Sequence, residues 1–202
     1  MPKILRVTCS AMGPASRSLA LADHFIDRLR ASDQNIEVAE RILLPDTMPH
    51  FRKELFSAIQ KSEPDRTEEE KRLLAFSDQL CAEVLAADTI VLAVPTYNMI
   101  MPSTLKAWIE HINRPGITFA PTENGPRGLL KARAVVICAR GGFAPPPAGD
   151  FHKSILTALL NFFGVQTIDW VAVNALQYSP DPEAVLAGAR SDLDQLAAGY
   201  LR

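Results

Sequence analysis

The chain has 202 residues, of which 48% are hydrophobic and 22% charged, and its 21 Lys and Arg against 23 Asp and Glu give a formal net charge of -2. This composition supplies one sizeable core, and the balanced charge argues against a nucleic-acid partner, which would need a basic stripe. Three widely spaced cysteines argue against a disulfide framework. The apolar stretch at the start is too short for a signal peptide, and no apolar run has the roughly 20 residues of a membrane span. We therefore expect a cytoplasmic protein without a membrane partner.

The chain alternates apolar runs typical of buried strands with amphipathic stretches typical of helices. Five strands are predicted, over residues 4–8, 36–43, 89–94, 134–138 and 167–173. Helices are predicted from about residue 18 and over residues 52–60, 67–86, 103–113, 150–163 and 180–201. Thr67 and Glu70 stand at the spacing of a capping box, which marks the start of the third helix. The pattern predicts a single doubly wound α/β domain over residues 1–202, with five parallel strands in the order 2-1-3-4-5 and helices on both faces.

The third predicted strand, residues 89–94, is the most apolar and is followed by a polar-aromatic loop. Pro95 ends the strand because it has no N–H to donate to a neighbouring strand. Ligands of open α/β sheets bind in the crevice at the carboxyl ends of the strands, where the strand order reverses. We therefore expect a ligand beside the loop of Thr96, Tyr97, Asn98 and Met99.

Two further loops are expected at the same edge of the sheet. In the first, Ser10, Ser16 and Ser18 offer hydroxyls at a helix N-terminus, whose free N–H groups suit a phosphate. An ordinary N-cap with turn serines explains that loop equally well. In the other, residues 139–143, which is the third loop along the chain after the second at residues 95–99, Gly141 and Gly142 let the backbone approach a ligand closely.

Other phosphate-binding devices are absent from the sequence. It contains neither G-x-x-x-x-G-K-[ST] nor G-x-G-x-x-G. Cys9 followed by Arg17 is similar to the loop of a cysteine phosphatase, but seven residues intervene, so we expect Cys9 to be a buried thiol. The four histidines show no metal-ligand spacing and are expected at the surface or at a rim.

Tyr97 and Asn98 supply a flat face and an amide edge, as a planar heterocycle requires, although Tyr97 packing on Trp108 or Phe143 is an alternative. A phosphate end and a flat-ring end on such a sheet together imply FMN.

The loops also carry a family resemblance. The chain resembles the FMN-dependent NAD(P)H azoreductases, the flavodoxin-like quinone and azo reductases of bacteria, over nearly its full length. The similar segments are S-x5-S-R-S at 10–18, V-P-T-Y-N at 94–98, T-F-A-P-T-E-N-G-P-R-G-L at 118–129 and A-R-G-G-F at 139–143. The resemblance implies a flavodoxin-like three-layer sandwich.

The resemblance also implies the cofactor-binding residues. The phosphate would be bound by Ser10, Ser16, Arg17 and Ser18. The ring would be bordered, largely by main chain, by Pro95, Thr96, Tyr97, Asn98, Met99, Ala139, Arg140, Gly141, Gly142 and Phe143. Phe119 and Phe162 would wall the substrate slot, with Phe119 acting in its own site or in the partner's.

The activity implied is that of an FMN-dependent NAD(P)H:quinone oxidoreductase or azoreductase, a homodimer with FMN at the interface. Hydride would pass from NADH or NADPH to the flavin N5, and two electrons would then pass to a quinone or azo compound, without a metal or a side-chain nucleophile. A flavodoxin-like FMN carrier or redox-sensing module without turnover remains an alternative, as does a phosphatase using Cys9.

Three features depart from the family pattern. Thr96 stands where methionine is common in the family, and Ala139 stands where serine is common. The change at Ala139 affects one expected hydrogen bond to the ring but not the identity of the cofactor. The run at residues 144–147 is unusually rich in proline and is expected to reshape the rim of the site.

Overall fold

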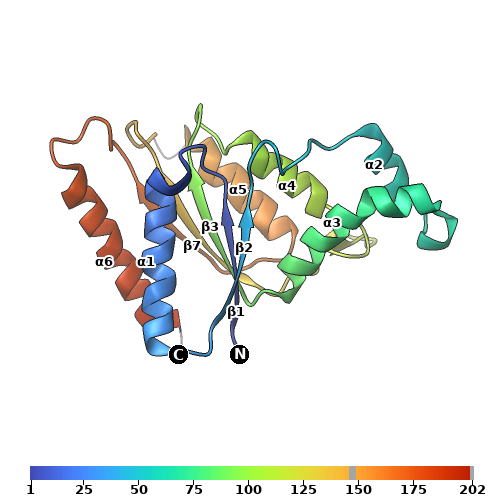
Figure 1. The fold of residues 1–202 in the computed structure, drawn as a ribbon, viewed down its shortest axis with the longest axis horizontal. Coiled ribbons are helices and arrows are strands. Elements are labelled where there is room, and N and C mark those ends of the chain that lie inside the picture. Colours follow the sequence, from blue (N-terminus) through green and yellow to red (C-terminus); the bar gives the residue numbers. More distant parts are fainter. Residues whose placement is uncertain (146–148, 201–202) are drawn as a thin grey trace.

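A parallel five-stranded sheet forms the centre of the fold (Figure 1). The computed structural model describes residues 1–145 and 149–200. The strands are β1 (Lys3–Thr8), β2 (Glu37–Ile42), β3 (Thr89–Pro95), β6 (Arg133–Ala139) and β7 (Ile168–Val173). Their order in the sheet is β2-β1-β3-β6-β7. Counted along the chain, this is the order 2-1-3-4-5, so the predicted fold is confirmed.

Helices cover both faces of the sheet (Figure 1). One face is covered by α1 (Arg17–Ser32) and α6 (Pro182–Tyr200), and the other by α3 (Glu68–Ala86), α4 (Ser103–Ile112) and α5 (Phe151–Phe162). The short α2 (Lys53–Ile59) packs on α3. The two layers of helices and the sheet between them make the three-layer sandwich.

The central strand β3 is buried along its whole length, as its apolar sequence predicts. Its side chains alternate between the two cores because successive residues of a strand face opposite sides. Ile90, Leu92 and Val94 pack with the α3–α5 layer, whereas Val91 and Ala93 pack with α1 and α6. This double burial holds β3 in the middle of the sheet and places the loop after Pro95 at its carboxyl edge.

Short elements differ most from the expectation. Phe119–Ala120 (β4) and Arg127–Gly128 (β5) form a two-stranded antiparallel sheet within a segment predicted as a loop. Two residues per strand are too few to produce a periodic sequence pattern. Gly13–Ala15 and Glu63–Asp65 form single turns of 3-10 helix. The capping box of Thr67 and Glu70 is present at the start of α3, as predicted.

The expectation for the histidines is wrong for two of the four. The side chains of His111 and His152 are buried, with 1% and 0% of their surface exposed. His111 lies on the buried face of α4, where its Nε2–H donates to the Pro49 carbonyl at 3.0 Å. Such partners come from distant segments, so the local sequence could not indicate the burial.

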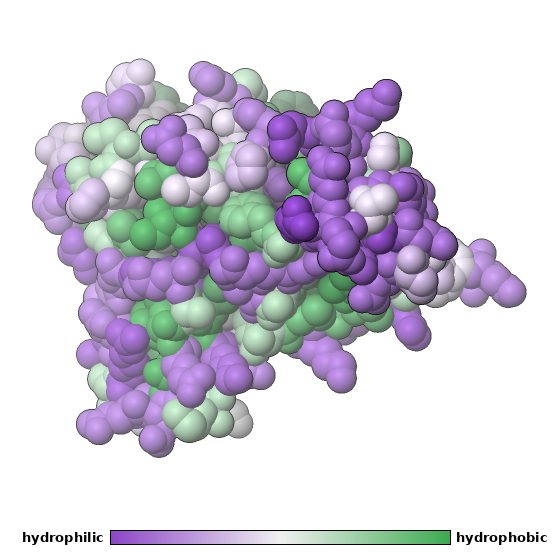
Figure 2. Space-filling view, turned by 45° about the vertical axis from the view of Figure 1, so that its right-hand side comes forward, coloured by the Kyte–Doolittle hydropathy of each residue, from purple (hydrophilic) through white to green (hydrophobic). Residues whose placement is uncertain are grey.

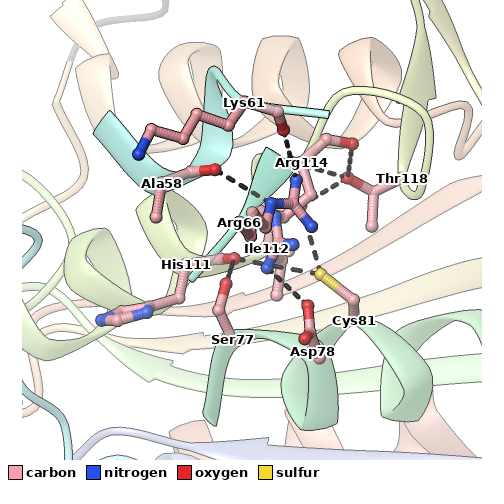
Figure 3. A network of polar contacts seen from close by, with 10 residues as sticks. All are labelled: Ala58, Lys61, Arg66, Ser77, Asp78, Cys81, His111, Ile112, Arg114 and Thr118. Atoms are coloured by element: carbon pink, nitrogen blue, oxygen red, sulfur yellow. Dashed lines mark hydrogen bonds and ion pairs between the residues drawn. The ribbon is translucent and has the colours of Figure 1, made fainter. Parts of the chain in front are cut away.

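A buried polar network joins α3 to the end of α4 (Figure 3). The Arg114 side chain is 1% exposed, and its Nη1 lies 2.7 Å from Asp78 Oδ1 of α3. The Ser77 hydroxyl donates to the His111 carbonyl, and the Thr118 hydroxyl accepts from the Arg114 backbone nitrogen at 3.1 Å. These contacts fix the segment that leads from α4 to β4.

Polar residues cover most of the face shown in Figure 2, and apolar residues lie in patches between them. A surface of this mixed kind is usual for folded proteins. None of the helices in the part of the chain that the structure describes is both long and apolar enough to cross a membrane.

Candidate functional site

The loops after β3, β6 and β7 meet at the carboxyl edge of the sheet. The Thr96 amide donates to the Ala139 carbonyl at 3.1 Å, and the Arg140 amide donates to the Val173 carbonyl at 2.8 Å. These bonds continue the sheet for one step beyond the strands. A pocket of about 540 Å³ lies against these loops and is lined by Pro95, Thr96, Tyr97, Asn98, Ala139, Gly141, Gly142 and Gln177.

Three buried serine hydroxyls lie at the N-terminus of α1. Ser10, Ser16 and Ser18 are 8%, 4% and 0% exposed. Ser16 is the N-cap of α1, where its Oγ accepts from the Leu19 amide at 3.4 Å and lies 3.1 Å from the Ser18 Oγ. The helix N-terminus, whose dipole favours negative charge, therefore has hydroxyl donors grouped beside it.

Tyr97 joins this serine group to the pocket. Its ring lies along the pocket wall, and its hydroxyl accepts from the Ala11 amide at 3.1 Å and lies 3.4 Å from Ser10 Oγ. The Tyr97 hydroxyl is directed at the first loop, and Phe143 stacks on Tyr178, so the structure does not favour the alternative in which Tyr97 packs on Trp108 or Phe143. The first and second loops thus form one continuous surface.

The second loop is a tight turn with an unusual backbone. Tyr97 and Ile100 exchange two backbone hydrogen bonds, of 3.0 and 3.1 Å, around Asn98 and Met99. Both central residues have positive φ, 48° and 74°. Positive φ at both central positions is the type I′ geometry, which Asn tolerates well and Met does not. The amides of Asn98 and Met99 find no acceptor among the described residues, which leaves two donors at the pocket.

The two glycines of the third loop have different surroundings. A Cβ placed on Gly141 would lie 2.7 Å from the Gln177 side chain, so that position is glycine because Gln177 packs on it. A Cβ placed on Gly142 would meet nothing within 4 Å. The open space that the sequence predicted for both glycines is therefore found at Gly142.

A fourth loop, residues 174–178, was missed by the sequence analysis. Its amides at Ala175, Leu176 and Gln177 donate to the third loop at 2.6, 3.2 and 3.0 Å. Gln177 also lines the pocket. The signal was available, because β7 is parallel to the other strands and its carboxyl end must reach the same edge.

A second pocket, of about 280 Å³, adjoins the first. Its lining residues are Thr96, Met99, Arg140, Gly141, Gly142, Phe143, Pro145 and Gly149. The ring of Phe143 stacks on Tyr178 at a centroid distance of 5.1 Å, and the two side chains are 72% and 64% exposed. The rim of the site therefore carries an exposed aromatic stack.

Other predicted site residues lie apart from the pocket. The Arg17 side chain is exposed and lies 3.7 Å from Glu183. Phe119 and Phe162 pack together with a centroid distance of 5.0 Å, at the end of α5 far from Asp150. A helix of 12 residues is about 18 Å long, so these rings lie near the amino edge of the sheet, where Leu130 bonds to Phe163. Residues 146 and 147 of the proline-rich run lie outside the described residues.

Cys9 has the environment of a structural thiol. It is 4% exposed, and burial raises the pKa of the thiol strongly. A reactive cysteine needs access and a lowered pKa. The histidines, cysteines and carboxylates of residues 1–145 and 149–200 form no group of three that could hold a metal ion.

The sequence and the fold match known proteins along the whole chain. Residues 2–197 match a protein family described as having a flavodoxin-like fold. The FMN-dependent NADH:quinone oxidoreductase of Azotobacter vinelandii is 38% identical over 199 residues, which cover 98% of this chain and 100% of the relative. A protein of the same name from Alcanivorax borkumensis is 38% identical over 192 residues, which cover 94% of this chain and 97% of the relative.

Solved structures agree with this match. An azoreductase from Bacillus anthracis strain Sterne is 25% identical, with a TM-score of 0.89 over 99% of this chain and 100% of that one. An FMN-dependent NADH-azoreductase from the Ames Ancestor strain, solved in complex with FMN, is 26% identical, with a TM-score of 0.87 over 98% of both chains. The chain belongs to the flavodoxin-like family that includes these quinone and azo reductases.

Proposed function

We propose that this protein is an FMN-dependent NADH:quinone oxidoreductase that also reduces azo compounds. The observation that carries the proposal is the pocket between the second and third loops, joined through Tyr97 to the buried serines of the first. This is the arrangement that a flat ring with a phosphate tail requires. The names of the similar proteins support the same cofactor, donor and acceptors.

The residues at the N-terminus of α1 suit the phosphate. Ser10, Ser16 and Ser18 present hydroxyls, and the first turn of α1 presents unpaired amides, within one loop. Arg17 has an exposed guanidinium that can turn toward a phosphate, because its distance of 3.7 Å from Glu183 is long for a hydrogen bond. We assign these four residues to phosphate binding.

The residues of the second and third loops suit the ring. Pro95 and Tyr97 give flat apolar surface, and Gly142 leaves space that any side chain would fill. The free amides of Asn98 and Met99 are donors held in place by the two bonds of the turn. The remaining assigned residues at the ring are Thr96, Ala139, Arg140, Gly141 and Phe143.

Bound FMN would supply the two-electron hydride chemistry. The protein's part is binding, orientation and electrostatics. The amides of the 97–100 turn would meet negative charge without rearranging, because their positions are already fixed.

We further propose a homodimer with the FMN site at the interface. Exposed apolar side chains surround the pocket, on the loops after β1, β3, β6 and β7 and on the first turns of α5. They are Met12, Met99, Ile100, Phe143, Phe151, Ile155 and Tyr178. Apolar surface gathered in this way is typical of an interaction site. Phe119 and Phe162, which lie far from the pocket of their own chain, would then wall the substrate slot of the partner.

We also propose a cellular location and a domain organisation for the protein. The described structure includes three free, buried cysteines, which suits a reducing cytoplasm. The family match over residues 2–197 supports one flavodoxin-like domain. The carrier without turnover stays as a second candidate function, because the same pocket would hold its FMN, whereas the buried Cys9 argues against the phosphatase.

An anaerobic titration of the purified protein tests the proposal. We expect a yellow protein whose flavin absorption bands bleach when NADH is added and return when a quinone is added. A parallel titration with NADPH compares the two electron donors. A colourless protein that takes up no FMN would contradict both flavin functions. A yellow protein that NADH leaves oxidised would favour the carrier. Sedimentation should give a dimer, and a fully active monomer would contradict the interface site.

A further inference from the structure

A cluster of buried polar side chains lies directly behind the wall of the 280 Å³ pocket. Thr96 and Arg140 belong to both the wall and the cluster, whereas Asp150 and His152, at the start of α5, do not line the pocket. His152 is fully buried and Arg140 is 7% exposed. Burying such groups is costly unless they are paired, so their arrangement calls for a role.

Arg140 is held from three sides. Its Nε donates to Thr96 Oγ1 at 3.1 Å, its Nη1 donates to Asn174 Oδ1 at 3.2 Å, and its Nη2 donates to both Asp150 oxygens at 2.7 and 2.9 Å. Asp150 also caps α5 by accepting from the Lys153 amide at 3.0 Å. The guanidinium therefore joins the second, third and fourth loops to the N-terminus of α5.

His152 completes the arrangement through the same hydroxyl. Its Nδ1 lies 2.8 Å from Thr96 Oγ1, and Cys138 Sγ lies 3.1 Å from that oxygen. Burial, together with the charge of Arg140, lowers the pKa of His152 to about 4, so the ring is neutral at neutral pH. Thr96 is thus bound by three side chains from β6, its following loop and α5.

Thr96 is the residue from which the flavin-binding turn starts. Its amide is bonded to Ala139, and the next residue, Tyr97, begins the turn that presents the free amides. A shift of Thr96 would therefore move these donors. A side chain without a hydroxyl could make no comparable set of hydrogen bonds at this position.

We propose that His152 is a positioning residue for the flavin: through the Thr96 hydroxyl it fixes the 97–100 turn, and so sets the affinity for FMN and its reduction potential without reaching the pocket. This inference rests on the proposed function. Because the reduced ring is more negative than the oxidised one, moving these donors out of place costs the reduced form more binding free energy, so loosening the turn lowers the potential.

The test compares variants that remove and keep the contact. His152→Phe and Thr96→Val remove it from either side, whereas His152→Asn and Thr96→Ser keep a polar atom near the place of the original one. His24→Gln is the matched control, because His24 pairs with Asp194 on the opposite face of the sheet. The readouts are the FMN dissociation constant from flavin fluorescence, the midpoint potential against a reference dye, and circular dichroism for folding.

We expect FMN binding to weaken about tenfold in His152→Phe and in Thr96→Val, with much smaller changes in the Asn, Ser and His24 variants. The reduced form should lose about tenfold more affinity than the oxidised form, which lowers the two-electron potential by about 30 mV. The double variant should resemble Thr96→Val, because that change already removes the contact that His152 makes.

Several results would overturn the inference. One is that the wild-type protein binds FMN and Thr96→Val binds it with the same dissociation constant and the same midpoint potential. Another is an effect of His152→Phe that Thr96→Val does not share, or that appears only in the thermal midpoint. Should His152→Phe not fold, His152→Leu, which is smaller and also lacks a polar atom, takes its place. A wild-type protein that binds no FMN would refute the proposed function and this inference together.

Discussion

The hydroxyl of Tyr97 accepts a hydrogen bond of 3.1 Å from the backbone nitrogen of Ala11, 86 positions earlier in the chain. It also lies 3.4 Å from Ser10 Oγ. One side chain thus holds the ring-binding loop against the phosphate-binding loop. The distance between the two ends of the proposed flavin site is fixed by this contact.

Removal of this hydroxyl should weaken flavin binding while leaving the aromatic wall in place. For Tyr97→Phe we expect an FMN dissociation constant about three- to tenfold higher, which corresponds to the loss of one or two neutral hydrogen bonds. Fluorescence titration measures it. Tyr178→Phe, which removes a hydroxyl from the exposed aromatic stack, is the control and should bind FMN as the wild type does. Equal effects of the two changes would argue against the link.

The serine group can be tested with two ligands that differ only in the phosphate. Ser18→Ala removes a fully buried hydroxyl that lies 3.1 Å from Ser16 Oγ. The buried Ser18 hydroxyl orients that of Ser16, and a neutral hydrogen bond of this kind contributes about 0.5–1.5 kcal/mol, so FMN should bind about three- to tenfold more weakly. Riboflavin, which lacks the phosphate, should bind with unchanged affinity. A parallel loss for both ligands would place the phosphate elsewhere.

Gly142 offers a steric test of the ring site. A Cβ at this position meets no atom within 4 Å, so a larger side chain fits the folded protein but enters the space assigned to the ring. Gly142→Leu should reduce FMN affinity at least tenfold, with the thermal midpoint nearly unchanged. Gly188→Leu adds the same side chain in open space on α6, away from the pocket, and should not affect binding. Undiminished binding by Gly142→Leu would refute the proposed ring position.

The sequence was sufficient to predict the strands and where their loops meet. The uninterrupted apolar run of β3 and the proline that ends it are local signals, and the parallel order follows from the alternation of strands with helices. No local signal predicts the positive φ of Asn98 and Met99, because Met is rarely found at positive φ. Only the closed turn between Tyr97 and Ile100 reveals it.

What the sequence could not indicate depends on contacts between distant segments. The burial of His152 follows from Thr96 and Cys138, which come from other strands and loops. The position of Phe162 is an exception, because the helix predicted over residues 150–163 is long enough to carry Phe162 far from the carboxyl edge of the sheet. Gln177 is a different case, because it follows β7, and the carboxyl end of every parallel strand lies at the edge of the sheet where ligands bind.

The ion pair between the buried Arg114 and the half-exposed Asp78 provides a stability prediction (Figure 3). Arg114 Nη1 and Asp78 Oδ1 are close, but their geometry is not that of a good hydrogen bond, so the attraction between them is mainly one of charge. Asp78→Ala leaves a guanidinium that is 1% exposed without its counter-ion, and should lower the free energy of unfolding by about 1–2 kcal/mol, less than for a fully buried pair because the Asp78 side chain is half exposed. Urea unfolding measures this change. Asp192→Ala, at an exposed position on α6, should change stability by less than about 0.5 kcal/mol.

The buried His152 makes stability depend on pH. Its pKa is about 4 in the folded protein, below the ordinary value of 6.5, because burial and the charge of Arg140 disfavour its protonated form. Between these two values the unfolded chain binds more protons than the folded one, so stability falls as the pH falls. The contribution is complete above pH 6.5 and declines progressively toward pH 4.

His152→Asn removes this titration while keeping a polar atom near Thr96. Between pH 7 and pH 5 the wild type should lose about 2 kcal/mol more unfolding free energy than the variant does. Burial also lowers the pKa of His111, but that residue is present in both proteins and cancels in the comparison. Urea unfolding at pH 7, 6 and 5 measures the difference. If the two proteins lost stability in parallel, His152 would be as free to accept a proton in the folded state as in the unfolded one, which its burial and its place beside Arg140 do not allow.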